Sequence, residues 1–243
     1  MSSEKPITRE NLNDYLKELA KEFRRLNGAK IPAEVILIGG AAVLANYGFR
    51  EMTYGIDAII HASSAMIDAI NRVGDKYDLP HGWFNTGFQR TASYSAKLNE
   101  VSVYYKTYSN VMQIRTVTAE NLIAMKLVSG RQYKNDLSDV AGILLEHKRR
   151  GEPIERVVIE AAIEKLYGDI DLPETSTELM NTAFTNGDYE KLYTESRKSE
   201  KLSKEILVEF EQDYPNTLKG ENISDIIEIA KQKRAAQMKG DGD

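Results

Sequence analysis

The chain contains no cysteine, which excludes disulfide bonds and thiolate-bound metal ions. Only three histidines occur (His61, His81 and His147), and they are too scattered to indicate a histidine-rich zinc site. No apolar run reaches about 18 residues, so we expect no membrane-spanning segment. The first residues lack the apolar core of a signal peptide. These absences together predict a cytoplasmic protein.

The chain also lacks an excess of positive charge. Its net charge of −5 argues against a protein that binds nucleic acid over its whole surface. A local basic patch remains compatible with this charge. The 243 residues, 42% of them hydrophobic, are enough for one large domain or two small ones.

Hydrophobic spacing predicts the helices. Apolar residues recur every three or four positions over residues 9–27, between a capping Thr8 and a terminating Gly28. Comparable spacing with caps and breakers predicts further helices at 41–47, 64–76, 118–130, 135–147, 153–167, 199–214 and 223–238. The last residues, 239–243, are expected to fray.

Short runs rich in β-branched residues predict the strands. Residues 35–38 are wholly apolar and indicate a buried strand, and residues 56–61 indicate a second. Residues 100–106 and 112–117 indicate a hairpin, and 79–97 an irregular segment. The predicted fold is α/β, with a mixed sheet of four or five strands and flanking helices.

The stretch Gly168–Pro173 is the best candidate for a domain boundary, because it combines glycine, two aspartates and proline. It divides the chain into a domain at 1–168 and a helical C-terminal region at 169–243. Segment 187–214 carries an apolar stripe. That stripe packs on its own domain or binds a partner.

A glycine pair follows the first buried strand. Gly39 and Gly40 precede a small-residue helix, an arrangement that lets backbone N–H groups approach phosphate oxygens. The simpler interpretation is a strand-to-helix turn in which glycine only relieves backbone strain. On the pair alone, the simpler interpretation is favoured.

Asp57 begins the next strand and is the candidate metal ligand. Carboxylates at positions i and i+2 of a strand share a face and can hold a pair of magnesium ions, but position 55 is glycine. Glu100, before the hairpin, is a candidate for a further carboxylate. The plainer alternatives are a hydrogen-bonded strand-end aspartate and a solvated glutamate.

A third group surrounds Lys126, which lies within an apolar helical stretch. Such a lysine either extends to the surface or faces a cleft, where it pairs with phosphate or with Asp136. Asp136 and Asp139 fall in the first turn of the next helix, where negative charge is favourable in any case. Spacing alone favours the helix-terminus interpretation.

These segments, in this order, resemble a known family. The residues that carry the likeness are Gly39-Gly40-x-Ala42, Tyr47-Gly48-x-Arg50, Thr53, Ile56-Asp57, Trp83-Phe84-Asn85, Leu122-x-Ala124-Met125-Lys126-Leu127, Gly130-Arg131 and Asp136-x-x-Asp139. The run resembles nucleotidyltransferase-fold proteins of the AbiEii and MenT toxin group, and most of all their uncharacterised relatives with a Gly-Gly motif. The likeness covers about residues 30–145.

The resemblance implies a site and an activity. Gly39 and Gly40, with Arg131, would bind the nucleotide, Asp57 would bind Mg²⁺, and Lys126 and Asp136 would complete the catalytic site. The implied activity is magnesium-dependent transfer of a nucleotide from NTP to RNA, including tRNA, by a toxin or phage-defence protein. The implied partner is a separately encoded antitoxin.

Gly55 departs from this pattern, because the family has the first aspartate of its Asp-x-Asp pair there. Three hypotheses follow: a nucleotidyltransferase impaired at Gly55, an inactive relative that binds nucleotide or protein, and an interaction protein that uses its C-terminal helices.

Overall fold

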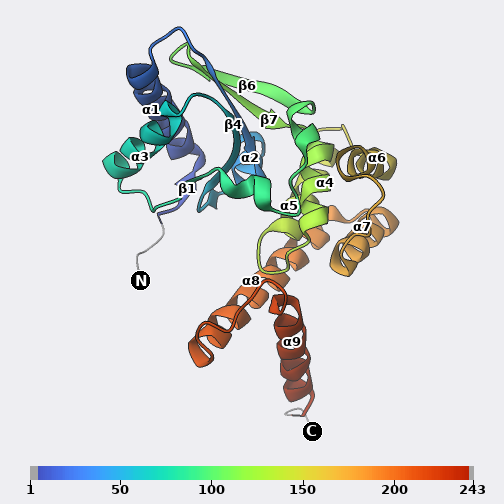
Figure 1. The fold of residues 1–243 in the computed structure, drawn as a ribbon. Coiled ribbons are helices and arrows are strands. Elements are labelled where there is room, and N and C mark those ends of the chain that lie inside the picture. The colour runs from blue at the N-terminus through green and yellow to red at the C-terminus, as the bar shows by residue number, and fades with distance from the viewer. Residues whose placement is uncertain (1–4, 241–243) are drawn as a thin grey trace.

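The computed structural model describes residues 5–240, with side chains through residue 234, and centres on a five-stranded mixed sheet (Figure 1). The strand order is β5-β4-β2-β7-β6. The strands are β2 (Ala33–Ile38), β4 (Ile56–His61), β5 (Phe84–Asn85), β6 (Ser102–Tyr108) and β7 (Met112–Val117). The predicted mixed α/β sheet is confirmed.

Strand β2 is central because its sequence is apolar on both faces. Residues 35–38 have no exposed surface. The strand runs antiparallel to β4, with Ile38 opposite Asp57, and parallel to β7. This register places Asp57 beside the residue that leads directly into Gly39.

Helices cover both faces of the sheet. They are α1 (Arg9–Asn27), α2 (Gly39–Asn46), α3 (Ala65–Tyr77), α4 (Ala119–Ser129), α5 (Asp136–Arg149) and α6 (Arg156–Tyr167). Helix α1 packs on α3, and α4 packs on α5 and α6. Thr8 caps α1 as predicted, and its hydroxyl and the Asn11 side chain form a reciprocal capping box.

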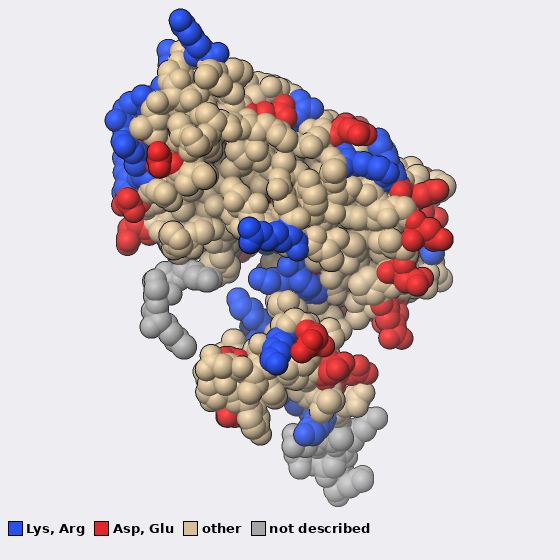
Figure 2. All heavy atoms as spheres, in the orientation of Figure 1, with Lys and Arg blue, Asp and Glu red and all other residues tan. Residues whose placement is uncertain are grey.

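Three further helices follow Gly168. They are α7 (Glu174–Asn186), α8 (Tyr189–Asp213) and α9 (Ile223–Gly240). Helix α8 packs along α5 before it extends away from the sheet with α9 (Figure 1). Lys and Arg side chains gather in the notch between these helices and the rest of the molecule (Figure 2). Leu179 and Met180 of α7 join the common hydrophobic core, and the boundary at residue 168 stays a prediction.

Several elements differ from the sequence expectations. Helix α2 starts at Gly39, so the glycine pair forms its first turn instead of preceding it. Residues 84–85 pair with β4, although their segment was expected to be irregular, because the carbonyl of Trp83 accepts a hydrogen bond from the Ile56 amide. Helix α8 begins ten residues before the predicted start, where the Asp188 side chain caps it.

Smaller elements were not predicted. Strands β1 (Ile7–Thr8) and β3 (Met52–Thr53) form a two-stranded pair, and α7 was missed. Of the tail expected to fray, residues 241–243 lie outside the described residues. Within the described part of the chain, no helix combines the length and the apolar character needed to cross a membrane.

Candidate functional site

The glycine pair lets three side chains approach the first turn of α2 closely. Gly39 has φ of +56°, and a Cβ there would lie 3.3 Å from Oδ2 of Asp57. A Cβ on Gly40 would lie 2.9 Å from Oγ1 of Thr53 and 3.0 Å from Nη2 of Arg50. Ile38, the N-cap residue, supplies no side-chain acceptor to the first-turn amides. Hence both glycines are needed for this close packing, and the N-cap side chain leaves the first-turn amides without a cap.

Asn85 holds Asp57 in place. Its Nδ2 donates to Oδ1 of Asp57 over 2.8 Å, and its Oδ1 accepts from the Gly87 amide over 2.8 Å. The pairing of β5 with β4 sets Asn85 directly opposite Asp57. The sequence pointed to Asn85 only through the Trp-Phe-Asn part of the family resemblance.

An ion network lies between α4 and α5. Nζ of Lys126 lies 2.8 Å from Oδ1 of Asp136 and 2.9 Å from Oδ2 of Asp139. Nε of Arg131 lies 2.7 Å from Oδ2 of Asp136. Nη1 of Arg50 lies 2.6 Å from both oxygens of Asp139. We call these five residues the ion network.

The network is buried on one side and open on the other. Lys126 is 7% exposed and Asp136 is fully buried, whereas 41% of the Arg131 side chain is exposed. Lys126 does not reach the surface, because two carboxylates pair its charge inside the protein. Arg131 is therefore the cation that a ligand can reach most readily.

In Lys126 and Asp136, pairing with opposite charges affects the pKa more than burial does. Burial opposes the charge of Lys126, but Asp136 and Asp139 outweigh it and raise the pKa of Lys126. Burial likewise opposes the charge of Asp136, yet Lys126 and Arg131 hold the pKa of Asp136 well below its ordinary range. Asp136 therefore stays ionised near neutral pH and acts as an acceptor of hydrogen bonds.

The charge of Arg131 interacts with more than one acidic group of the site. Burial lowers the pKa of Arg131, but the hydrogen bond and charge of Asp136 and the charges of Tyr133 and Asp57 together raise it. The negative charges of Asp136, in the ion network, and of Asp57, beside the glycine pair, therefore both act on its guanidinium.

The structure groups the predicted site residues in two sets. Gly39, Gly40 and Asp57 form one set, and Lys126, Arg131 and Asp136 form the other. Asp136 is buried against the two cations, a geometry that suits an orienting role, and its catalytic role stays a prediction. So does the predicted contact of Lys126 with phosphate.

Two residues of the network were missed as site residues. Arg50 appeared only in the resemblance motif, and Asp139 was interpreted as a favourable first-turn charge. Their pairing joins segments 89 positions apart, which spacing along one helix cannot reveal. The one sequence signal for this pair was that Arg50 and Asp139 each belong to a motif of the family resemblance.

The residues present do not fit a centre with two Mg²⁺ ions. Asp57 supplies one carboxylate, and Gly55 supplies none. Among the residues that the structure describes, no three His, Asp or Glu side chains gather to hold a metal ion. Glu100 is exposed beside β6, and β2 and β7 separate β6 from β4. Of the two carboxylates in the family's Asp-x-Asp pair, this chain keeps one, at Asp57, and the role of Asp57 as a metal ligand stays a prediction.

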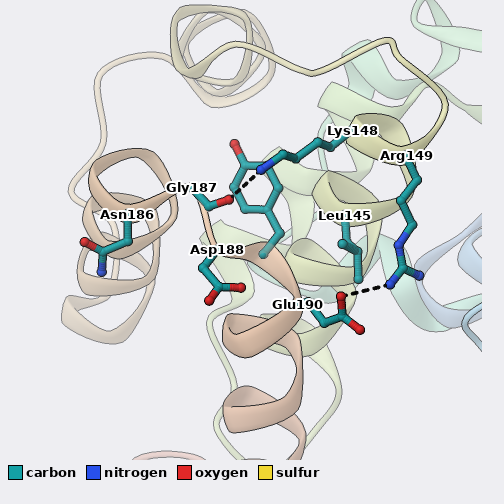
Figure 3. Close-up of a pocket in the computed structure, with 8 residues that line it drawn as sticks. Leu145, Lys148, Arg149, Asn186, Gly187, Asp188 and Glu190 are labelled. Atoms are coloured by element: carbon teal, nitrogen blue, oxygen red, sulfur yellow. Dashed lines mark hydrogen bonds and ion pairs between the residues drawn. The ribbon is translucent and has the colours of Figure 1, made fainter.

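A surface hollow lies away from these residues. It has a volume of about 530 Å³ and is lined by the C-terminal end of α5 and the turn between α7 and α8 (Figure 3). Nζ of Lys148 donates to the Gly187 carbonyl over 2.8 Å, and Arg149 pairs with Glu190 at 3.2 Å. None of the site residues above lines this hollow.

Comparisons with known proteins give a family and a solved structure that the chain is similar to. A crystal structure of an antigenic nucleotidyltransferase-like protein from Paracoccidioides brasiliensis is 13% identical, with a TM-score of 0.39, over 78% of this chain and 95% of its own. No curated protein matches the chain. Residues 14–169, more than half of the chain, match one family and include the glycine pair, Asp57 and the ion network. The chain therefore belongs to the family described as nucleotidyltransferases of unknown function, DUF6036.

Proposed function

We propose that the chain binds a nucleoside triphosphate at the first turn of α2, and that it is a nucleotidyltransferase whose transfer step is impaired by Gly55. The observation that carries the proposal is the set of donors at the first turn of α2: Nη2 of Arg50 would lie 3.0 Å from a Cβ on Gly40, beside first-turn amides that the N-cap residue Ile38 does not cap. Within the described residues, Nη2 has no hydrogen-bond partner, while Nη1 and Nε of the same side chain are engaged. A donor held in place beside helix amides suits a phosphate oxygen.

Of the remaining site residues, some contact the phosphates and others hold these contacting residues in position. In this proposal Arg131 contacts the phosphates through its exposed side, and Asp57 lies beside Gly39. Lys126 and Asp136 hold Arg131 and the start of α5 in position. In this proposal the protein contributes electrostatic stabilisation and orientation, the main requirements of phosphoryl chemistry.

The finer assignment rests on the resemblance to AbiEii and MenT toxins. It comprises dependence on Mg²⁺, an RNA acceptor such as tRNA, a role as a toxin or in phage defence, and a cognate antitoxin. A bound Mg²⁺, held by Asp57 and phosphate oxygens, would supply neutralisation of phosphate charge.

Basic groups beside the site favour a polyanionic acceptor. Nζ of Lys204 on α8 lies 5.5 Å from the centre of the Tyr54 ring, next to Gly55. Nζ of Lys231 on α9 lies 3.2 Å from Oε1 of Gln132, next to Arg131. Both lysines lie on the C-terminal helices, where Lys204 approaches Tyr54 and Lys231 approaches Gln132. The positive charges of these lysines would attract the phosphate backbone of a nucleic acid bound there.

The alternative is a family member that binds nucleotide or protein without transfer. Gly55 and the single carboxylate at Asp57 favour it, because loss of a metal carboxylate weakens leaving-group stabilisation.

Titration calorimetry with each of the four NTPs, with and without Mg²⁺, tests the proposal. Binding of one NTP supports a nucleotide site, and labelling of RNA with that NTP then separates an enzyme from a binding protein. Absence of binding for all four NTPs in both conditions contradicts the proposal.

Replacing Gly40 with alanine is expected to weaken NTP binding by about tenfold or more, because the new Cβ meets Thr53 and Arg50 within 3.0 Å. Gly48→Ala is the matched control, since a Cβ there would meet nothing within 4 Å. Calorimetry on both variants measures the difference. Equal NTP affinities would place the phosphates away from Gly40.

A further inference from the structure

A carboxylate from α8 caps the start of α5. Oε1 of Glu200 accepts from the Leu137 amide over 2.9 Å and from the Ser138 amide over 3.0 Å. Asn135, the N-cap residue of α5, makes no side-chain cap of its own. The amides that α5 leaves open at its first turn are thus satisfied from a distant part of the chain.

Burial of the Glu200 carboxylate costs desolvation free energy, which a solvated glutamate on the surface does not lose. It is 4% exposed, and no salt bridge to it occurs among the described residues. Two amide donors and the positive end of the α5 dipole offset part of the cost of burying this carboxyl group. The family match ends at residue 169, so this contact joins a segment outside the match to the site within it.

The capped turn is the one that carries the ion network. Asp136 and Asp139 occupy the same first turn of α5, and each orients an arginine of the site. A shift of that turn moves Arg131 and Arg50 together. A displacement of about 1 Å in a positioning contact is enough to affect function strongly.

We propose that Glu200 is a positioning residue of the nucleotide site, which fixes the first turn of α5 and, through Asp136 and Asp139, the two arginines that face the phosphates. This proposal rests on the proposed nucleotide-binding function for its second readout, whereas its first readout is independent of nucleotide.

The first readout is hydrogen exchange of the Leu137 and Ser138 amides, in the full-length protein without nucleotide. Glu200→Ala is expected to raise their exchange rates about tenfold or more, while Glu200→Gln keeps an acceptor oxygen and retains most of the protection. Glu205→Gln, a change of a half-exposed glutamate on the same helix, should match the unmodified protein. Unchanged exchange in Glu200→Ala overturns the proposal.

The second readout is NTP affinity. Glu200→Ala is expected to weaken NTP binding about tenfold, and Glu200→Gln to restore it to within about threefold. If the unmodified protein binds no NTP, the proposed function fails, yet the exchange rates still decide whether Glu200 holds the turn. If NTP binds and Glu200→Ala binds it equally well, the positioning role is wrong.

A pH profile separates positioning from simple packing. Burial raises the pKa of Glu200 to about 7, against hydrogen bonds from Ser138 and Leu137, and the charge of Asp139 adds to the rise. The charge of Glu200 also acts on Arg197 of α8, which hydrogen-bonds Tyr193, and Lys231 of α9 bonds to the neighbouring Ser199. Between pH 6 and about 8, the ratio of NTP affinities of the unmodified protein and Glu200→Gln should change about threefold. A constant ratio would show that ionisation of Glu200 does not reach the arginines.

Discussion

An aspartate introduced at position 55 is expected to raise the rate of nucleotide transfer by about a hundredfold or more, since a first metal carboxylate contributes at this scale. Position 55 directly precedes β4 and is two residues before Asp57, so a side chain there would share a face with Asp57 if the extended backbone of the strand continues to it. A Cβ at Gly55 would find only the Trp83 carbonyl, 3.8 Å away, and the residue does not have a positive φ. The fold therefore accepts the side chain without strain.

Transfer of label from the NTP found by calorimetry to total RNA, with Mg²⁺, measures the effect. Gly55→Asn is the matched control, because it has the same shape and lacks the charge. Asp57→Asn combined with Gly55→Asp should abolish the gain, because only one of the two carboxylates is then present. A Gly55→Asp variant that binds NTP and transfers nothing would favour the alternative, a family member that works by binding.

The sheet and the position of the glycine pair could be predicted from local pattern. Residues 35–38 are apolar on both faces, which only a central strand accommodates, and Gly39 follows at the strand end. The hairpin of β6 and β7 also follows from local pattern, because Ser109 and Asn110 both adopt positive φ in the turn between them.

The ion network could be predicted only in part. The pairing of Lys126 with Asp136 was one of the alternatives that the sequence left open, beside a lysine that extends to the surface, and spacing alone favoured a helix-terminus role for Asp136. Arg50 and Asp139 were not paired, since their contact depends on how α5 packs against the loop after α2. Glu200 carried no signal at all, because a glutamate within a charged helix is usually solvated.

The contact of Asn85 with Asp57 could likewise not be predicted from the local sequence. Asn85 lies in a segment rich in Gly, Ser and Thr that predicts irregular structure, and only the two-residue pairing with β4 brings it to Asp57. Local propensity was correct for most of this segment. The exception is set by a partner strand whose position the segment itself does not encode.

Replacing Asp136 with alanine is expected to lower the free energy of unfolding by about 3–5 kcal/mol, the effect of removing one partner from a buried ion pair. Asp136 is fully buried and bonds Lys126 and Arg131, so its loss leaves the buried Lys126 with Asp139 alone. Because its pKa is lowered in the folded state, the stability it contributes is present above a pH of about 4 and is lost as the pH falls. Urea unfolding at pH 7 measures the loss.

The double variant Lys126→Met with Asp136→Leu distinguishes burial of an unpaired charge from loss of packing. It is expected to recover most of the lost stability, because apolar side chains of similar volume replace both charges. Glu160→Ala supplies the matched surface control, since Glu160 pairs with Arg156 at 2.7 Å while both side chains are about half exposed. Its effect should stay within about 1 kcal/mol. Equal losses from Asp136→Ala and Glu160→Ala would show that the network contributes no more than a surface pair, and that other contacts hold Arg131 at the site.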